Sequence, residues 1–91
     1  MNTLEIFLKS LEKMRSDGMF YVSRYVVTPT KINCLETHLI EVYLVDYTNN
    51  KELISSVSKN YNTTEYTINS IKEELYVDII TKILEYYNLT I

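Results

Sequence analysis

A single glycine, Gly18, and a single proline, Pro29, are the feature that most limits how this 91-residue chain can fold. Tight reversals of the backbone depend heavily on these two residue types, so few sites for sharp turns between strands remain. This scarcity disfavours an all-β sandwich and favours helices joined by short polar turns. The length suits one domain over residues 1–91, and 46% hydrophobic residues are enough to build one core.

Hydrophobic spacing predicts a mainly α fold with one N-terminal extended strand. Apolar residues recur every three or four positions in "TLEIFLKSLEKMRS", which predicts a helix over about 3–16, with Thr3 as its N-cap and Gly18 as its stop. The next segment, "MFYVSRYVV" at 19–27, is aromatic and β-branched, which favours a strand. Its partner would be either the chain end "NLTI" or its own copy in a second subunit.

Three more helices are expected after the strand. Thr28 and Pro29 read as an N-cap and a first-turn proline, opening a helix through "TKINCLETHLIEVYLVDY". A short helix is expected over 51–61. The last helix would begin after Thr63 or Thr64 and either run to about residue 87 or break near 76–78.

The stretch "VSKNYNTTEYTINSIKEEL", residues 57–75, fits the pattern of a helix-turn-helix. Ser58 is small where the two helices would approach closely, and Tyr61 is a large plug. Asn62 tolerates the left-handed backbone of a corner. Ile68 and Ile71 fall on the inner face of the second helix. The alternative reading is an ordinary bend between two packed helices.

In that register, residues 64–75 would enter the major groove of double-stranded DNA. Asparagine can pair with adenine, glutamate can accept from cytosine, and hydroxyl side chains can reach phosphates or bases. The predicted DNA-binding residues are Arg24, Lys31, Lys59, Asn62, Thr63, Thr64, Glu65, Tyr66, Asn69, Ser70 and Lys72.

The corner "SKNYNTTEYTINSI" resembles the helix-turn-helix in the C-terminal effector domain of the sporulation response regulators of bacilli and clostridia. The upstream "VTPTKINCLETHLIEVYLV" is similar to the Pro-initiated helix of that domain, so the resemblance covers about 27–75. It implies that Asn62 to Thr64 lie near phosphates and that Glu65, Tyr66, Asn69 and Ser70 lie over bases. Asn60 stands where that family has a lysine. The strand ahead of the corner, the size and the composition also resemble winged-helix accessory proteins of clostridial conjugative plasmids, which implies a winged-helix variant.

Charge and the remaining polar residues narrow the function classes. The net charge is −3, but residues 1–31 carry +2 and the remainder −5, so the N-terminal part would face phosphates. His38 has no second ligand or base at a useful spacing and reads as structural or surface, while the lone Cys34 reads as a small core residue. No enzymatic activity, catalytic residue, metal site, cofactor or small-molecule substrate is therefore expected. The absence of a signal peptide or an apolar run of about 20 residues predicts a cytoplasmic protein without a membrane partner.

Three functions remain open at this point. The first is a sequence-specific DNA-binding protein, either a transcriptional regulator or an accessory factor of plasmid or phage DNA in conjugation. The alternative is a small phage or plasmid inhibitor that binds protein and no DNA. The third is a structural oligomer. A homodimer is expected, held by the 19–27 strand and a stripe of Ile79, Ile83 and Tyr87.

Overall fold

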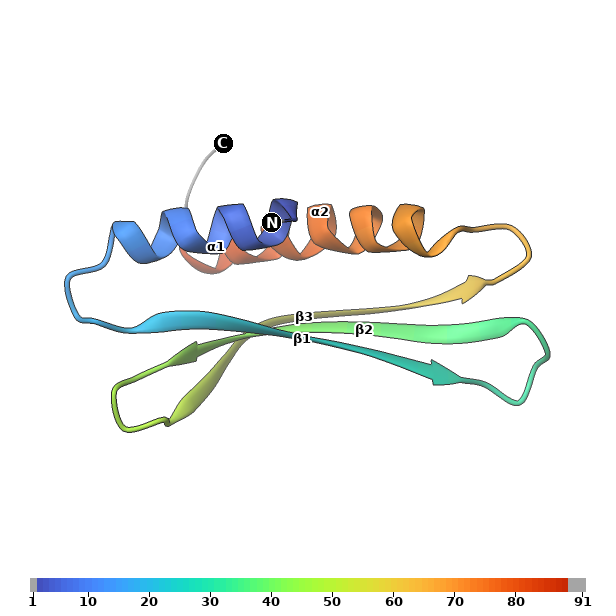
Figure 1. Cartoon of the computed structure of the whole chain (residues 1–91), viewed down its shortest axis with the longest axis horizontal. Helices are drawn as coiled ribbons and strands as arrows, with labels where there is room; N and C mark the ends of the chain where they lie inside the picture. Colours follow the sequence, from blue (N-terminus) through green and yellow to red (C-terminus); the bar gives the residue numbers. More distant parts are fainter. Residues whose placement is uncertain (1, 89–91) are drawn as a thin grey trace.

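The computed structural model describes residues 2–88 and is an α+β fold. Helix α1 (Thr3–Lys13) is followed by strands β1 (Phe20–Pro29), β2 (Leu35–Val45) and β3 (Lys51–Asn62) and by helix α2 (Ile68–Tyr86). The strands form one sheet, and both helices lie on the same side of it (Figure 1). The expectation of a mainly α fold, helix-turn-helix or winged-helix-like, is therefore wrong.

The sheet is an antiparallel meander in the order β1-β2-β3. The first hairpin pairs Phe20 with Val45 at one end and Pro29 with Glu36 at the other. The second hairpin pairs β2 with β3 along their whole length, with an irregularity between Val42 and Tyr43. The predicted N-terminal strand is confirmed, and β2 is its partner. Most of the other suggested partner, the chain end "NLTI", lies outside the described residues. The helices predicted from Thr28 onward and over 51–61 are wrong, since both segments are strands.

The alternation of buried and partly buried residues explains why β2 is extended. His38, Ile40, Val42 and Leu44 are buried, whereas the residues between them are only partly covered. A period of two is the signature of a strand with one face against the core. The helical reading followed Leu35, Leu39 and Val42, whose spacing of four and three also occurs by chance in an apolar strand.

Other residues than glycine make the hairpin turns. Cys34 (φ 63°) in the β1–β2 turn and Asn49 (φ 65°) in the β2–β3 turn adopt the left-handed conformation that glycine usually supplies. Asp46 supports the second turn, since its Oδ1 accepts hydrogen bonds from the backbone N–H groups of Thr48 (2.8 Å) and Asn50 (3.0 Å). The near absence of glycine therefore did not exclude a meander, and Cys34 is exposed, not part of the core.

The two helices form a single layer over the sheet, α1 beside β1 and α2 beside β3 (Figure 1). Asn2 caps α1, accepting from the Glu5 N–H, and Thr67 caps α2, accepting from the Ser70 N–H. The core between the layers is built from leucines of α1, isoleucines of α2 and the inner residues of the sheet. Ile79 and Ile83 are fully buried within it. They cannot form the dimer surface that their spacing suggested.

Candidate interaction surface

One face of the sheet carries no helix (Figure 1). The register places alternate residues of each strand on it. Phe20 is 41% exposed and Leu53 is 49% exposed, although both belong to strands. We call this surface the open face. Its apolar members are Phe20, Val22, Val26, Leu39, Tyr43 and Leu53.

The charges at the centre of the open face neutralise one another. The Nη1 of Arg24 lies 3.2 Å from the Oε1 of Glu41, across the β1–β2 pair. The Tyr43 hydroxyl donates to the other oxygen, Oε2, at 3.0 Å, and this hydrogen bond raises the pKa of Tyr43. The Glu41 side chain is only 14% exposed as a result. The centre of the open face is therefore nearly neutral, whereas the chain as a whole is acidic. The register also places polar residues on this face: Thr28, Thr37, Ser56, Ser58 and Asn60.

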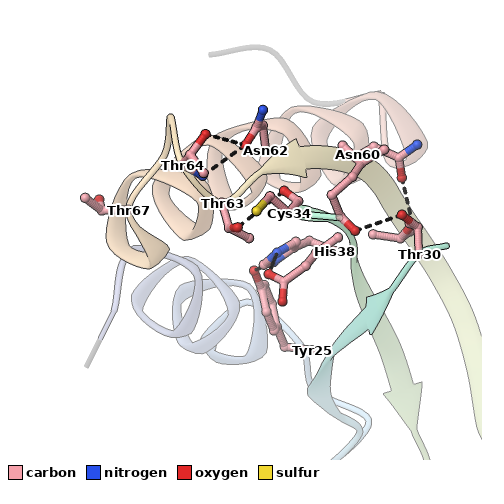
Figure 2. Close-up of polar contacts among 12 residues, drawn as sticks. Tyr25, Thr30, Cys34, His38, Asn60, Asn62, Thr63, Thr64 and Thr67 are labelled. Atoms are coloured by element: carbon pink, nitrogen blue, oxygen red, sulfur yellow. Dashed lines mark hydrogen bonds and ion pairs between the residues drawn. The ribbon is translucent and has the colours of Figure 1, made fainter. Parts of the chain in front are cut away.

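A second polar cluster lies on the other side of the sheet, beneath the helices (Figure 2). The Tyr25 hydroxyl is 2.6 Å from His38 Nδ1, and His38 Nε2 is 3.3 Å from Glu36 Oε1. This order of hydroxyl, imidazole and carboxylate is chemically similar to a nucleophilic triad. Two observations oppose that reading, because His38 is 1% exposed and burial raises the pKa of Tyr25 to about 12. A nucleophile needs an accessible group with an activated hydroxyl, so the cluster is structural.

The predicted corner is the loop between β3 and α2. Asn62 Oδ1 accepts from the backbone N–H (3.0 Å) and the hydroxyl (2.7 Å) of Thr64 (Figure 2). The Thr63 N–H donates to the Cys34 carbonyl at 2.8 Å, which ties this loop to the β1–β2 turn. The Tyr66 ring packs edge-on against Tyr61, with ring centres 5.3 Å apart. Asparagine and threonine thus close a turn here, and the segment does not cross a first helix.

The other predicted DNA contacts lie on different parts of the molecule. Asn69 and Ser70 occupy the first turn of α2, with Glu65 exposed in the loop before it. Lys31 is exposed in the β1–β2 turn. Since Arg24 is on the open face and the Lys72 ammonium lies 5.4 Å from the centre of the Tyr25 ring on the helical side, the set does not form one surface.

Two acidic residues of α2 engage the remaining predicted cation. Lys59 contacts Asp78 and, at 3.2 Å, Glu74. These carboxylates raise the pKa of Lys59, the Asp78 contact more than the Glu74 contact. A lysine held this way must break two ion pairs before it can neutralise a phosphate.

The residues of the open face were missed because β2 and β3 were read as helices. Their signal is present in the alternation of "LETHLIEVYLV", where Leu39 and Tyr43 fall between the buried residues. Val26 pairs with Leu39, and Leu53 pairs with Tyr43, so the hairpin register could then have placed both on the open face.

Searches with this chain against family models, curated proteins and solved structures found no match. Between residues 2 and 88, neither helix has the length and apolar character needed to cross a membrane. The same residues contain no group of three or more His, Cys, Asp or Glu side chains placed to share a metal ion.

Proposed function

We propose that this chain is a protein-binding module whose open face docks on an apolar, weakly charged surface of another protein. The observation that carries the proposal is the bare side of the sheet, where Phe20, Tyr43 and Leu53 stand beside three further apolar side chains. Val22, Tyr43 and Leu53 are neighbours across the three strands, and contiguous apolar surface of this kind typically marks an interaction site. A small inhibitor that covers an apolar patch on its target would use the same chemistry.

Charge supports a protein partner over a nucleic acid. Phosphate recognition requires free lysines and arginines. Here four of the nine lysines and arginines are in salt bridges with carboxylates of the same chain, namely Lys9, Arg15, Arg24 and Lys59. Helix α2 begins within the segment that was predicted to enter the major groove of DNA. It carries more acidic than basic residues. DNA binding stays a prediction, now without the helix-turn-helix that motivated it.

Site-specific photo-crosslinking in the native cell tests the proposal. A photoreactive amino acid would replace Val26 or Leu53 on the open face, and in a control it would replace Val77, an apolar residue of α2 that is 60% exposed. We expect the same discrete protein adduct from both open-face positions and none from Val77. Adding Leu53→Lys should abolish the adduct from position 26 while leaving the melting temperature close to that of the parent.

Two outcomes would contradict the proposal. Equal adducts from Val77 and Val26 would show random collisions instead of a docking face. A salt-sensitive mobility shift with DNA from the gene's own locus, lost in Asn69→Ala and unchanged in Leu53→Lys, would assign the chain to DNA instead.

A further inference from the structure

We infer that β1 pairs with β1 of a second copy, antiparallel and centred on Tyr25, so that two sheets join into one continuous sheet. This inference goes beyond the proposed function and does not depend on it. It rests on which outward backbone groups of the two edge strands already have hydrogen-bond partners. It also rests on the symmetry of the groups that β1 presents at its outer side.

The edge at β3 is partly occupied by α2, which packs beside this strand. The Lys82 ammonium donates to the backbone carbonyl of Ser56 at 3.1 Å, which occupies an outward acceptor of that edge. Lys59 of the same strand is held by Glu74 and Asp78 of α2. Only the Lys82 contact uses an edge group, since the backbone of Lys59 is turned toward β2. An edge acceptor occupied in this way hinders the addition of another strand at that point.

At the β1 edge, only the two ends lack a free outward N–H group. The Tyr21 N–H donates to Glu12 Oε1 at 2.8 Å, so the backbone of Tyr21 points away from β2. Because alternate residues of a strand point to the same side, Ser23, Tyr25, Val27 and Pro29 also present their backbone groups outward. Pro29 has no N–H to donate, and edge positions are where proline is tolerated in a sheet. None of the hydrogen bonds recorded within residues 2–88 uses the outward groups of Ser23, Tyr25 or Val27.

Tyr21 and Pro29 have no free outward N–H, and they are equally far along the strand from Tyr25. This symmetry identifies the partner as a second copy. A two-fold axis at Tyr25 sets Tyr21 opposite Pro29 of the partner subunit. The residue whose N–H is already used then faces the residue that has none. Between them, Ser23, Tyr25 and Val27 meet Val27, Tyr25 and Ser23 of the partner subunit, and about six backbone hydrogen bonds form.

The two registers shifted toward Tyr21 are poorer. A shift that centres the pair on Arg24 sets two guanidinium groups directly opposite each other, which is destabilising. A shift that centres it on Ser23 brings the occupied Tyr21 N–H against Tyr25 of the partner subunit. In the Tyr25-centred register Arg24 faces Val26 of the partner subunit and keeps Glu41 as its counter-ion. The helices of both copies then lie on one side, and the two open faces form one surface.

Proline substitution on either edge tests the pairing. Ser23→Pro removes an outward N–H of β1, and the matched control Ser58→Pro removes an outward N–H of β3. Both changes are compatible with the fold of the single chain, because edge strands accept proline at such positions. By sedimentation velocity we expect a dimer for the wild type and Ser58→Pro, and at least about a tenfold weaker dimer for Ser23→Pro. Val27→Pro should repeat this result if Ser23→Pro fails to fold.

Disulfide trapping tests the register in a background where Cys34→Asn removes the native thiol. Val22→Cys with Thr28→Cys places the new thiols opposite each other in the Tyr25-centred pair, at a separation suited to a disulfide. Val22→Cys with Val26→Cys does so in the Arg24-centred or a Val26-centred pair, but not in the Tyr25-centred pair. We expect rapid covalent dimers from the first variant alone. A monomer at high micromolar concentration, a dimer indifferent to Ser23→Pro and Val27→Pro, or trapping only in the second variant would overturn the inference.

Discussion

At the scale of single residues, Cys34 is the least suited to its backbone. Its φ of 63° lies in the left-handed region, which costs an ordinary L-residue about 1–2 kcal/mol. Cys34→Gly should relieve that cost, and after the extra chain entropy of glycine we expect a gain of up to about 1 kcal/mol in the free energy of unfolding. Urea denaturation would measure it. Asn49→Gly is the control, because asparagine tolerates this conformation and should gain less.

Tyr25 should make the protein sensitive to alkali. Burial raises the pKa of Tyr25 to about 12 in the folded state, while a tyrosine in an unfolded chain titrates near 10. Above the unfolded value the unfolded chain releases a proton that the native state keeps, so stability is complete below about pH 10 and falls toward pH 12. We expect the melting temperature to drop over this window. Tyr25→Phe should start from a lower melting temperature, having lost the His38 contact, but should decline less steeply.

Ile83→Asp should unfold the chain. The side chain is fully buried between the layers, and an unpaired carboxylate there has no compensating partner. We expect a loss of more than about 4 kcal/mol, whereas Val77→Asp on the exposed side of the same helix should cost about 1 kcal/mol or less. Circular dichroism during thermal unfolding would separate the two. A folded Ile83→Asp protein with altered association would restore the original expectation that this residue lies in an interface.

At the scale of elements, the sequence was informative at both ends of the chain and misleading in the middle. Helix α1 and strand β1 were predicted nearly at their true bounds, because the first has clean helical spacing and the second is dense in β-branched and aromatic residues. Helix α2 was predicted to start several residues early. Between residues 30 and 62 the apolar positions fit both periods, and the lack of glycine decided wrongly for helix.

The false helix-turn-helix has a geometric explanation. Val57 and Tyr61 are both buried, as that motif requires. A spacing of four residues puts two side chains on the same face of a helix and also on the same face of a strand. The pattern around the corner therefore could not distinguish the two structures. The open face was missed because its position depends on the hairpin register, and β2 and β3 were read as helices.

The start of α2 offers a direct test of the corrected boundary. Thr67 accepts from the Ser70 N–H and is the N-cap, while Thr64 lies in the preceding loop. Thr67→Ala should cost about 1 kcal/mol of stability, the usual value of a lost cap. Thr64→Ala removes only an exposed contact with Asn62 and should cost less. The reverse order of the two losses would place the helix start at the corner, as the sequence suggested.

At the scale of the whole molecule, all helical cover is on one side of the sheet. The helical side carries the exposed acidic residues Glu73, Glu74 and Glu85, and the open face carries the compensated Arg24–Glu41 pair. One side is thus suited to water and the other to a second apolar surface. This division, and not any single side chain, is what distinguishes the proposed module from a protein that reads DNA with an exposed helix.

The two helices come from opposite ends of the chain, and α1 is anchored only to α2 and to β1. Strand β2, in contrast, is hydrogen-bonded on both sides. Local opening should follow this difference, so that α1 detaches as a unit while the meander stays intact. In native-state hydrogen exchange, the amides of Leu8 and Leu11 should exchange well before those of Ile40 and Val42. Leu8→Ala should accelerate the first pair far more than the second. Each opening would briefly expose the core residues that α1 covers, giving proteases and chaperones access to the core without unfolding of the sheet.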